Sequence, residues 1–421
     1  MRLYMLKILF FLIPTFLLAS INGILLDKNT TLPIAGAKIF DLKNEVVSDK
    51  NGRFSIDTNE TLVHVKAYGY RPYSFKSDAN TSKLYIEPIQ IKALYLSFWG
   101  ANIKSKTLKK IMKMIDDKQI NAIVVDVKNE FGWTSYKTDY TKANDIDAWR
   151  HRTIKDIDKF MQLMKQKNVY MIARVVVFKD ELRAKNYPQF ALKDKNGTVW
   201  RNREKMAWVD PYMSKSYDYV LSIAADAAKR GFDEINFDYV RFPAKLSLQF
   251  SKQNNQKNRV QAIGNFIEDA QKKLRPYGVF VSVDTYGNVC WADDDTNIGH
   301  TIKSLAQYAD YLAPMLYPSG FAAGSFGFNN PAAEPYETIY RSVKHIHCDI
   351  DPKRVRPWLQ AFKDYAFDRR HYKKTEIQEQ IKACVDANTS GWMFWNPASK
   401  YNESYFIPTD EPSRLYQAQN R

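Results

Sequence analysis

Eight short apolar runs alternate with longer amphipathic segments from residue 91 onward, and this alternation restricts the fold more than any other feature. The runs are nearly continuous in apolar residues, as in strands of a parallel sheet that is buried on both faces. They span 93–99, 122–128, 169–178, 234–242, 279–286, 311–317, 354–362 and 391–395. Helical periodicity fills the intervals at 104–117, 154–167, 214–230, 260–274, 302–308, 336–345 and 376–387.

Eight strand–helix units in this order match an eight-stranded parallel barrel, which typically needs about 250 residues or more. A doubly wound sheet is the competing fold. It would place G-x-G-x-x-G after its first strand, whereas W-G-A-N stands at 99–102. We therefore predict an α/β fold, a (β/α)8 TIM barrel over residues 92–421, preceded by a small all-β sandwich and a signal peptide.

The segment 21–91 alternates apolar and polar residues with turn residues between the runs, as in a small all-β domain. Candidate strands are 21–26, 37–41, 53–56 and 62–67, and Asn51-Gly52 predicts a hairpin turn. Four motifs in order, Gly23, P-I-A-G-A at 33–37, D-K-N-G-R-F at 49–54 and G-Y at 69–70, resemble the carboxypeptidase regulatory-like domain, a transthyretin-like β-sandwich. The resemblance implies an accessory module that stabilises, spaces or binds a partner, and no catalysis.

Residues 1–20 have the form of a secretory signal. Arg2 and Lys7 precede an apolar run at 8–18, and Ala19 and Ser20 are small residues suited to cleavage. The run is short for a membrane span, so an uncleaved anchor is the alternative. We expect an exported protein, periplasmic or extracellular, without a stable membrane span after cleavage.

The charge of +16 is spread over a lysine-rich chain without a dense basic run, so nucleic acid is not an expected partner. Cys290, Cys348 and Cys384 are too few for a disulfide framework and allow one bridge at most. None of the six histidines lies at a predicted strand end, where a hydrolytic metal site would need them. We therefore expect no metal and no cofactor.

Polar residues gather at the carboxyl ends of the predicted strands, which meet at one mouth of a barrel. Asp238 lies within D-E-I-N-F-D-Y-V-R-F-P at 233–243, where a buried carboxylate needs a partner or a function. The alternative is a structural Asp–Arg pair. Asp126, Lys128 and Glu130 share the parity of one strand face.

Carboxylates beside aromatic and basic residues suit glycoside hydrolysis, in which one carboxyl group donates a proton and a second acts as nucleophile or activates water. Asp238 is the first candidate for catalysis and Asp284 the second, followed by Asp126 and Glu130. The residues expected to bind substrate are Trp99, Lys128, Arg174, Arg241, Tyr317, Trp358, Gln360 and Trp395. The expected partner is a polysaccharide or oligosaccharide.

Five ordered motifs carry a second resemblance: N-A-I-V-V-D-V-K at 121–128, F-D-Y-V-R-F-P at 237–243, A-P-M-L-Y-P-S at 313–319, P-W-L-Q-A-F at 357–362, and G-W at 391–392 with W-N at 395–396. Together they resemble the bacterial putative glycosyl hydrolase domain, a family long catalogued as being of unknown function. The resemblance covers about residues 92–400 and implies a barrel with glycosidase activity. Gly320 stands where the family pattern suggests histidine after Tyr-Pro-Ser.

Two further departures keep a different class of function open. Val240 occupies the position of the terminal acid of chitinase-type barrels, and Gln360 replaces the glutamate that ends the seventh strand of two-glutamate barrels. The alternative is therefore a non-catalytic carbohydrate-binding or envelope-assembly protein. Pairing of every mouth carboxylate with Arg or Lys would favour it. The glycine-containing segment 320–327 is either a loop that closes over the mouth or an ordinary crossover.

Overall fold

The computed structural model describes residues 19–78, 81–245, 247–347 and 349–408. The predicted signal segment lies, up to residue 18, outside these residues. Contacts divide the chain into two units, one formed by residues up to 65 with 73–86 and one by 66–72 with residues from 87 onward. In the described part of the chain, no helix is both long and apolar enough to cross a membrane.

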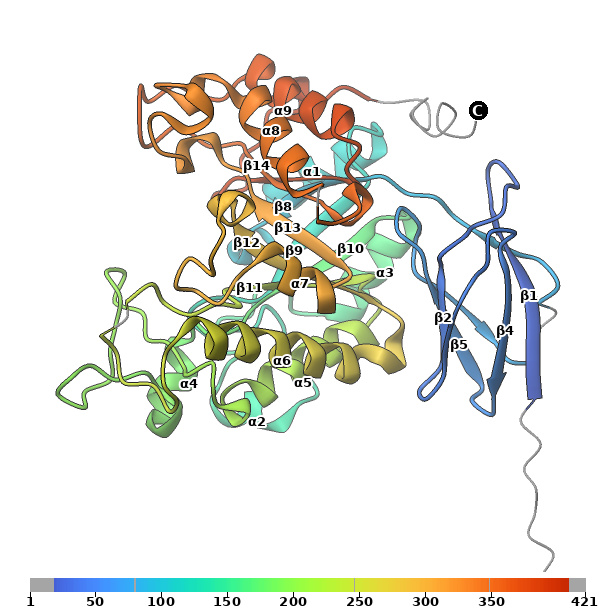
Figure 1. Cartoon of the computed structure of the whole chain (residues 1–421), viewed down its shortest axis with the longest axis horizontal. Helices are drawn as coiled ribbons and strands as arrows, with labels where there is room; N and C mark the ends of the chain where they lie inside the picture. Colours follow the sequence, from blue (N-terminus) through green and yellow to red (C-terminus); the bar gives the residue numbers. More distant parts are fainter. Residues whose placement is uncertain (1–18, 79–80, 246, 348, 409–421) are drawn as a thin grey trace, which may run out of the picture. The chain divides into compact units, whose positions relative to one another are not determined.

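The smaller unit consists of short strands in two sheets, drawn in blue in Figure 1. One sheet has the order β4-β1-β7, from β1 (Ala19–Asp27), β4 (Arg53–Thr58) and β7 (Leu84–Ile86). The other has the order β3-β2-β5-β6, from β2 (Lys38–Phe40), β3 (Glu45–Val47), β5 (Leu62–Lys66) and β6 (Tyr73–Lys76). The all-β prediction is confirmed.

The turn at Asn51-Gly52 exists, but the hairpin prediction is wrong. Gly52 has a φ of 71° and donates its N–H to the Asp49 carbonyl at 2.9 Å. However, β3 before the turn pairs with β2, and β4 after it pairs with β1. The tight turn therefore carries the chain from one sheet to the other, a choice that depends on distant pairing rather than on turn residues.

The larger unit is the predicted parallel barrel, closed in the order β10-β11-β12-β13-β14-β15-β8-β9. Its strands are β8 (Ile91–Leu96), β9 (Ala122–Lys128), β10 (Tyr170–Val176), β11 (Glu234–Asp238), β12 (Phe280–Tyr286), β13 (Tyr311–Met315), β14 (Trp358–Gln360) and β15 (Gly391–Trp395). All eight predicted strands are present. The run 234–242 is shorter than expected, because Tyr239 leaves the extended conformation with a φ of 52°.

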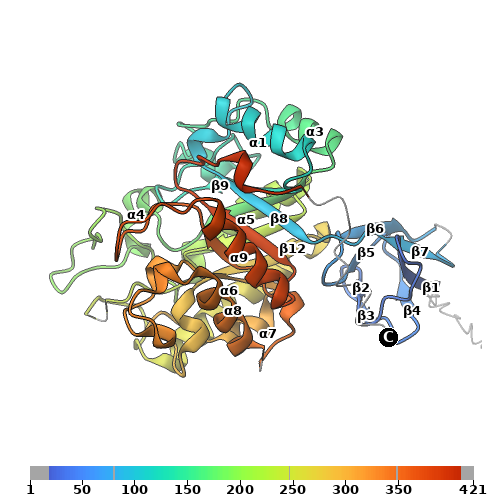
Figure 2. The ribbon, with the colours of Figure 1, turned by 90° about the horizontal axis from the view of Figure 1, so that it is seen from above.

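Helices surround the strands in Figure 2. They are α1 (Lys106–Asp116), α2 (Thr141–Asp145), α3 (Ile157–Gln166), α4 (Glu181–Asn186), α5 (Ser214–Lys229), α6 (Gln256–Leu274), α7 (Ile302–Tyr308), α8 (Pro335–Ile346) and α9 (Lys374–Asp386). Side-chain caps set where several begin: Ser105 accepts from the N–H of Leu108, and Asp156 from that of Lys159. Sequence periodicity missed the short helices α2 and α4.

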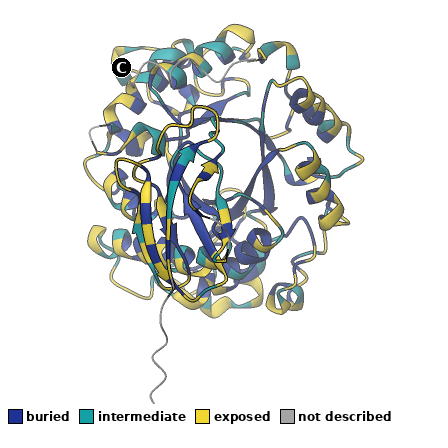
Figure 3. Cartoon of the chain, turned by 90° about the vertical axis from the view of Figure 1, so that its right-hand side faces the viewer, coloured by how far each residue is buried: buried dark blue, intermediate teal, exposed yellow. Residues whose placement is uncertain are grey.

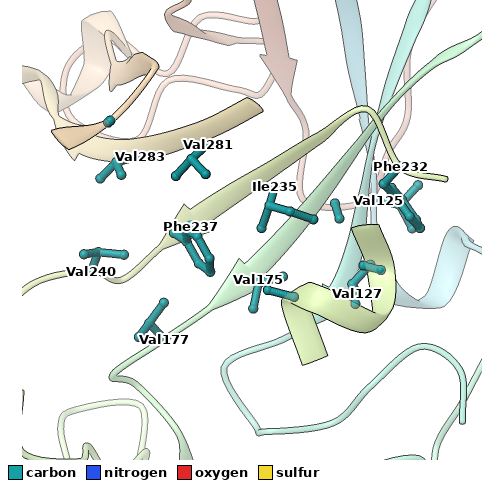
Figure 4. Close-up of a cluster of buried hydrophobic side chains, with 14 of the residues drawn as sticks. Val125, Val127, Val175, Val177, Phe232, Ile235, Phe237, Val240, Val281 and Val283 are labelled. Carbon is teal, nitrogen blue, oxygen red and sulfur yellow. The ribbon is translucent and has the colours of Figure 1, made fainter. Parts of the chain in front are cut away.

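The strands pack their outward side chains against the helices and fill the barrel with the inward ones. The outward set includes Val125, Val175, Ile235 and Val281, which lie close together in Figure 4. In Figure 3 the helices around the barrel carry exposed positions on their outer faces and buried positions toward the strands. This burial on both faces explains why the strands lack a clean apolar–polar alternation.

The barrel closes where β15 pairs with β8, and a glycine permits the closure. Gly391 pairs with Ile91 and has a φ of 113°, a conformation that other residues rarely adopt. A Cβ atom at this position would lie 1.9 Å from the Ile91 carbonyl oxygen. A side chain is therefore excluded both by backbone conformation and by contact with the neighbouring strand.

We expect Gly391→Ala to lower the free energy of unfolding by more than about 3 kcal/mol, since backbone strain adds to a steric clash. Gly197→Ala is the matched control, because Gly197 also has a positive φ (79°) but nothing lies within 4 Å of its added Cβ. The control should lose about 1–2 kcal/mol from strain alone. Chemical denaturation measures both. Equal losses would show that the contact with Ile91 does not limit closure.

Candidate active site

Arg174 on β10 joins two carboxylates from the neighbouring strands inside the barrel. Register places Arg174 directly beside Asp126 of β9 and beside Asn236 of β11. The guanidinium donates through Nη1 to Asp126 at 2.5 Å, and through Nε at 3.0 Å and Nη2 to Asp238. All three side chains are buried, so the positive charge of Arg174 compensates both negative charges where water does not.

Asp126 has a second partner, Tyr95 of β8, whose hydroxyl donates to it at 2.6 Å. Burial raises the pKa of Asp126, and the negative charge of Glu130 adds to this effect, although Arg174 and Tyr95 oppose it. Glu130 follows the end of β9 and is partly exposed. Its carboxylate makes no hydrogen bond or ion pair with the described residues. Glu130 is thus a carboxylate close to the paired acids but without a cation of its own.

Asp284 on β12 is the acid whose surroundings favour the protonated form. Its Oδ1 accepts from the amide of Asn236 at 2.8 Å and from the indole N–H of Trp358 at 2.8 Å, and both donors are uncharged. Burial raises the pKa of Asp284 well above its usual range, and the negative charge of Asp238 raises it further. Asp284 and Asp238 therefore lie near each other with different electrostatic partners.

The turn after Asp238 holds a strained residue. Tyr239 adopts the left-handed region at a φ of 52°, and its N–H donates to Oδ1 of Asp238 at 2.6 Å. Bulky side chains rarely occupy this region, and such strain concentrates at functional sites. The turn also directs Arg241 into a cage of three rings, 4.9 Å from the ring centre of Trp208, 5.0 Å from that of Tyr239 and 4.6 Å from that of Tyr286.

A buried histidine supports this turn from below. The Nε2 atom of His300 bonds the Val240 carbonyl, and Nδ1 bonds the hydroxyl of Thr285 on β12 at 2.8 Å. Because a carbonyl only accepts, Nε2 carries the proton and Nδ1 accepts from Thr285. Burial lowers the pKa of His300 to about 4, despite the favourable hydrogen bond from Val240. The neutral ring thus ties the turn to the neighbouring strand.

Aromatic residues predicted to bind substrate occupy the same end of the barrel. Trp395 on β15 is partly exposed and stacks on Tyr95, with ring centres 3.8 Å apart. The Arg174 guanidinium lies 5.1 Å from the Trp395 ring centre. Tyr317 follows β13 and has its pKa raised, first by burial and then by the charges of Asp284 and Asp238. Trp99 follows β8 and is 63% exposed.

Three of the residues predicted to bind substrate have other positions and partners. Lys128 is fully buried, since the pairing of β9 with β10 skips Val127 and turns Lys128 toward Asp180 at 2.8 Å and the ring of Tyr219 on α5. It therefore does not share the face of Asp126, as parity had indicated. Gln360 is also fully buried and donates to the hydroxyl of Ser319 at 2.7 Å.

Trp358 is 1% exposed and donates its only N–H to Asp284. We therefore assign neither Lys128 nor Gln360 to substrate contact, and we assign Trp358 to the positioning of Asp284. Arg174, likewise buried, acts on the two carboxylates.

Sequence reasoning missed Tyr95 and His300. Period-two spacing on the first strand, with Ile91 and Ala93 on the same inward face, contained a signal for Tyr95. No sequence signal marks His300, because its partners Val240 and Thr285 are 60 and 15 residues away.

No group of three or more His, Cys, Asp or Glu among the described residues is arranged to hold a metal ion. Cys290 and Cys384 are buried free thiols, and Cys348 lies outside the described residues. In the segment 320–327, Phe326 packs against Trp291 and Phe321, with ring centres 5.0 Å apart in both pairs. Closure of this segment over the mouth stays a prediction.

Comparison with known proteins gives one family and several structures. A family model described as "Putative glycosyl hydrolase domain" matches residues 93–401. No curated protein matches the chain. The glycoside hydrolase domain of PgaB (BpsB) from Bordetella bronchiseptica is 12% identical with a TM-score of 0.56, and the alignment covers 74% of this chain and 95% of that domain. At this identity the likeness shows the fold alone.

Two other solved structures align with lower TM-scores. A hypothetical protein from Ruminiclostridium thermocellum is 33% identical with a TM-score of 0.40, covering 45% of this chain and 96% of its own. The spore cortex-lytic enzyme SleL from Bacillus megaterium is 12% identical with a TM-score of 0.46, covering 78% of this chain and 77% of its own.

We expect the neutral state of His300 to make the protein sensitive to acid. Between pH 6.5 and about 4 the unfolded chain binds the proton that folded His300 refuses, so the free energy of unfolding falls as the pH is lowered. The loss at pH 4.5 relative to pH 7 should be about 2–3 kcal/mol from this residue.

His300→Gln keeps a donor for the Val240 carbonyl but cannot take up the proton. Denaturation at both pH values should therefore show a stability difference between wild type and variant that shrinks on acidification. A difference that is the same at pH 7 and pH 4.5 would show that His300 does not titrate as its burial requires.

Proposed function

The chain belongs to the family described as "Putative glycosyl hydrolase domain", and from this premise we propose that it is a glycoside hydrolase that cleaves a polysaccharide by carboxylate acid–base chemistry. The observation that carries the proposal is the pair of acids on adjacent strands β11 and β12. Asp238 faces the charge of Arg174, whereas Asp284 is held by two neutral donors in a buried position. Environments that separate the protonation states of two carboxyl groups assign their roles.

Asp284 takes the role of general acid. A carboxyl group with a raised pKa retains its proton near neutral pH and can give it to the glycosidic oxygen as the bond breaks. Asn236 and Trp358 both donate to Oδ1, which leaves Oδ2 to carry the proton. Trp358 and Asn236 thereby orient the acid rather than the sugar.

A second carboxylate must stabilise or attack the sugar carbon, or activate water. Asp238 supplies negative charge beside Asp284, and Arg174 fixes its orientation through two donors on one oxygen. Glu130 has no cationic partner among the described residues and is more accessible, which suits the activation of water. We assign Asp238 to charge stabilisation and Glu130 to water activation.

The expected substrate is a cell-envelope or extracellular polysaccharide. The basic start and the apolar run of residues 1–20 support export, and a positively charged protein favours encounter with acidic surfaces. The smaller all-β unit has the accessory role that its resemblance implies.

A non-catalytic carbohydrate-binding protein is the second candidate, and one observation favours it. Asp126 and Asp238 both pair with Arg174, as expected if these carboxylates served only structure. Asp284 and Glu130 make no such pair among the described residues, so the condition that every mouth carboxylate is paired is not met. This difference places hydrolysis first.

We expect Asp284→Asn to lower kcat by about 10²–10⁴-fold on a polysaccharide that wild type cleaves, because the variant cannot donate a proton. Release of reducing ends measures the rate. The wild-type rate should fall on the alkaline side as Asp284 loses its proton, and this alkaline limb should be absent from the residual activity of the variant. Glu130→Gln should remove the acidic limb instead.

Asp386→Asn, on the outer helix α9, is the control and should retain wild-type activity. Circular dichroism and thermal unfolding confirm that each variant is folded. Undiminished activity of Asp284→Asn would exclude it as the acid. Binding without cleavage by wild type, across bacterial envelope polysaccharides, would favour the second candidate.

A further inference from the structure

Exposed aromatic side chains of the larger unit concentrate at one end of the barrel. The large apolar residues exposed in its described part are Trp99, Phe131, Tyr286, Trp291, Tyr365 and Ile407. All but Ile407 are aromatic, and all five aromatic residues follow the carboxyl end of a barrel strand. Aromatic surface left in water at one place marks a site of interaction rather than an accident of packing.

The first aromatic cluster consists of Trp99, Phe131 and Trp133, from the loops after β8 and β9. Phe131 and Trp133 stack with ring centres 4.7 Å apart and an interplanar angle of 14°. Trp99 meets Trp133 edge to face at 6.2 Å. Trp99 is 63% exposed and Phe131 41% exposed, so ring surface remains free for a ligand.

The loop that carries this cluster is held in one conformation. The Asn129 side-chain oxygen accepts the N–H groups of Phe131 and Trp133, each at 3.1 Å. Gly132 between them has a φ of 88°, and a Cβ there would lie 2.4 Å from Oδ1 of Asp180. The stacked rings are therefore preorganised, which reduces the entropy cost of binding a ligand.

The second aromatic cluster consists of Tyr317, Phe362 and Tyr365, from the loops after β13 and β14. Tyr317 meets Phe362 edge to face at 5.3 Å, and Phe362 lies parallel to Tyr365 at 6.2 Å with an angle of 9°. Tyr365 is 53% exposed. Asp364 is buried and accepts the N–H groups of Ala366, Phe367 and Arg369, which fixes this loop as well.

The strand order places the two clusters on either side of Trp395. In the closed ring, β15 has β13 and β14 on one side and β8 and β9 on the other. Four steps around the same ring lead from β15 to β11, so Trp395 stands across the barrel from Asp238. Trp395, partly exposed, thus forms the middle of an aromatic arc whose ends are the two clusters.

We propose that this aromatic arc is a binding track for an extended sugar chain, with stacking positions on both sides of the acids. Sugar rings present apolar C–H faces that stack on aromatic rings, as few other polar polymers do. A chain centred on Trp395 faces Asp238 and contacts one cluster with each of its halves. The track therefore selects internal bonds of long chains, so the enzyme acts as an endo-glycosidase; this second statement rests on the proposed function.

Trp291 lies outside the track. Its ring stacks on His345 at 4.3 Å, and its N–H donates to Ser342 at 3.0 Å, both on α8. Its partial exposure is explained by packing against that helix.

The experiment measures the binding of oligosaccharides from chitin, deacetylated chitin and cellulose, each as a disaccharide and an octasaccharide. The proteins are the full chain as wild type, Trp99→Ala, Trp99→Phe and Tyr365→Ala. Ile407→Ala is the matched control: Ile407 is similarly exposed, but the adjacent Phe406 carbonyl bonds Gln119, before the amino end of β9.

The expected result is that an octasaccharide of at least one series binds about tenfold or more tightly than its disaccharide. Trp99→Ala and Tyr365→Ala should each weaken octasaccharide binding about fivefold to tenfold, with little effect on the disaccharide. Trp99→Phe should restore part of the loss, and Ile407→Ala should bind as wild type. Equal affinities for both lengths, cluster variants that bind as wild type, or no binding by any series would overturn the track.

The products separate this inference from the proposed function. Length-dependent binding without hydrolysis would leave the track in place and remove the hydrolase. Hydrolysis that releases a single small product from the chain ends would retain the hydrolase and overturn internal cleavage. A ladder of oligosaccharides released early in the reaction supports both.

Discussion

The bridge that Arg174 makes between Asp126 and Asp238 is the interaction on which the mouth of the barrel depends. Three charges from adjacent strands lie where water is excluded, and removal of the guanidinium would leave two buried anions without a partner. Such a loss costs about 3–5 kcal/mol. The same bridge orients Asp238 beside Asp284, so structural stability and the chemistry of the site rest on one side chain.

A second buried pair lies at the amino ends of the strands. Arg356 donates to Glu234 at 2.6 Å, and Tyr170 donates to the same oxygen at 3.0 Å. Both charged groups are almost fully buried, and no other charged residue of the described chain is needed to balance them. The two layers differ in their surroundings: Asp238 is followed by a strained turn and half-exposed aromatic residues, whereas Glu234 is followed by the interior of β11.

Neutral hydrogen-bonded side chains position the charged ones. His300 holds the turn that contains Tyr239, and Asn236 with Trp358 holds Asp284. Asn129 and Asp364 do the same for the two loops that carry the aromatic clusters. Acid chemistry at the barrel mouth is thus supported by groups that keep one protonation state, which prevents the supports from titrating with the site.

The sequence alone determined the barrel and the end at which its polar groups gather, because burial on both faces and helical periodicity are local properties of the chain. It identified Asp126, Asp238 and Asp284 as strand-end acids. It could not show that Arg174 takes two of them, since that depends on the register of β9, β10 and β11.

Only the tertiary structure decided the rest. One skipped residue in the β9–β10 pairing turned Lys128 away from Asp126, and the pairing of β3 with β2 separated the strands that flank Asn51-Gly52. His300 and the aromatic arc came from residues far apart in the chain. Local pattern fixes which segments become strands, whereas register and ring order, which arise from long-range packing, fix which side chains meet.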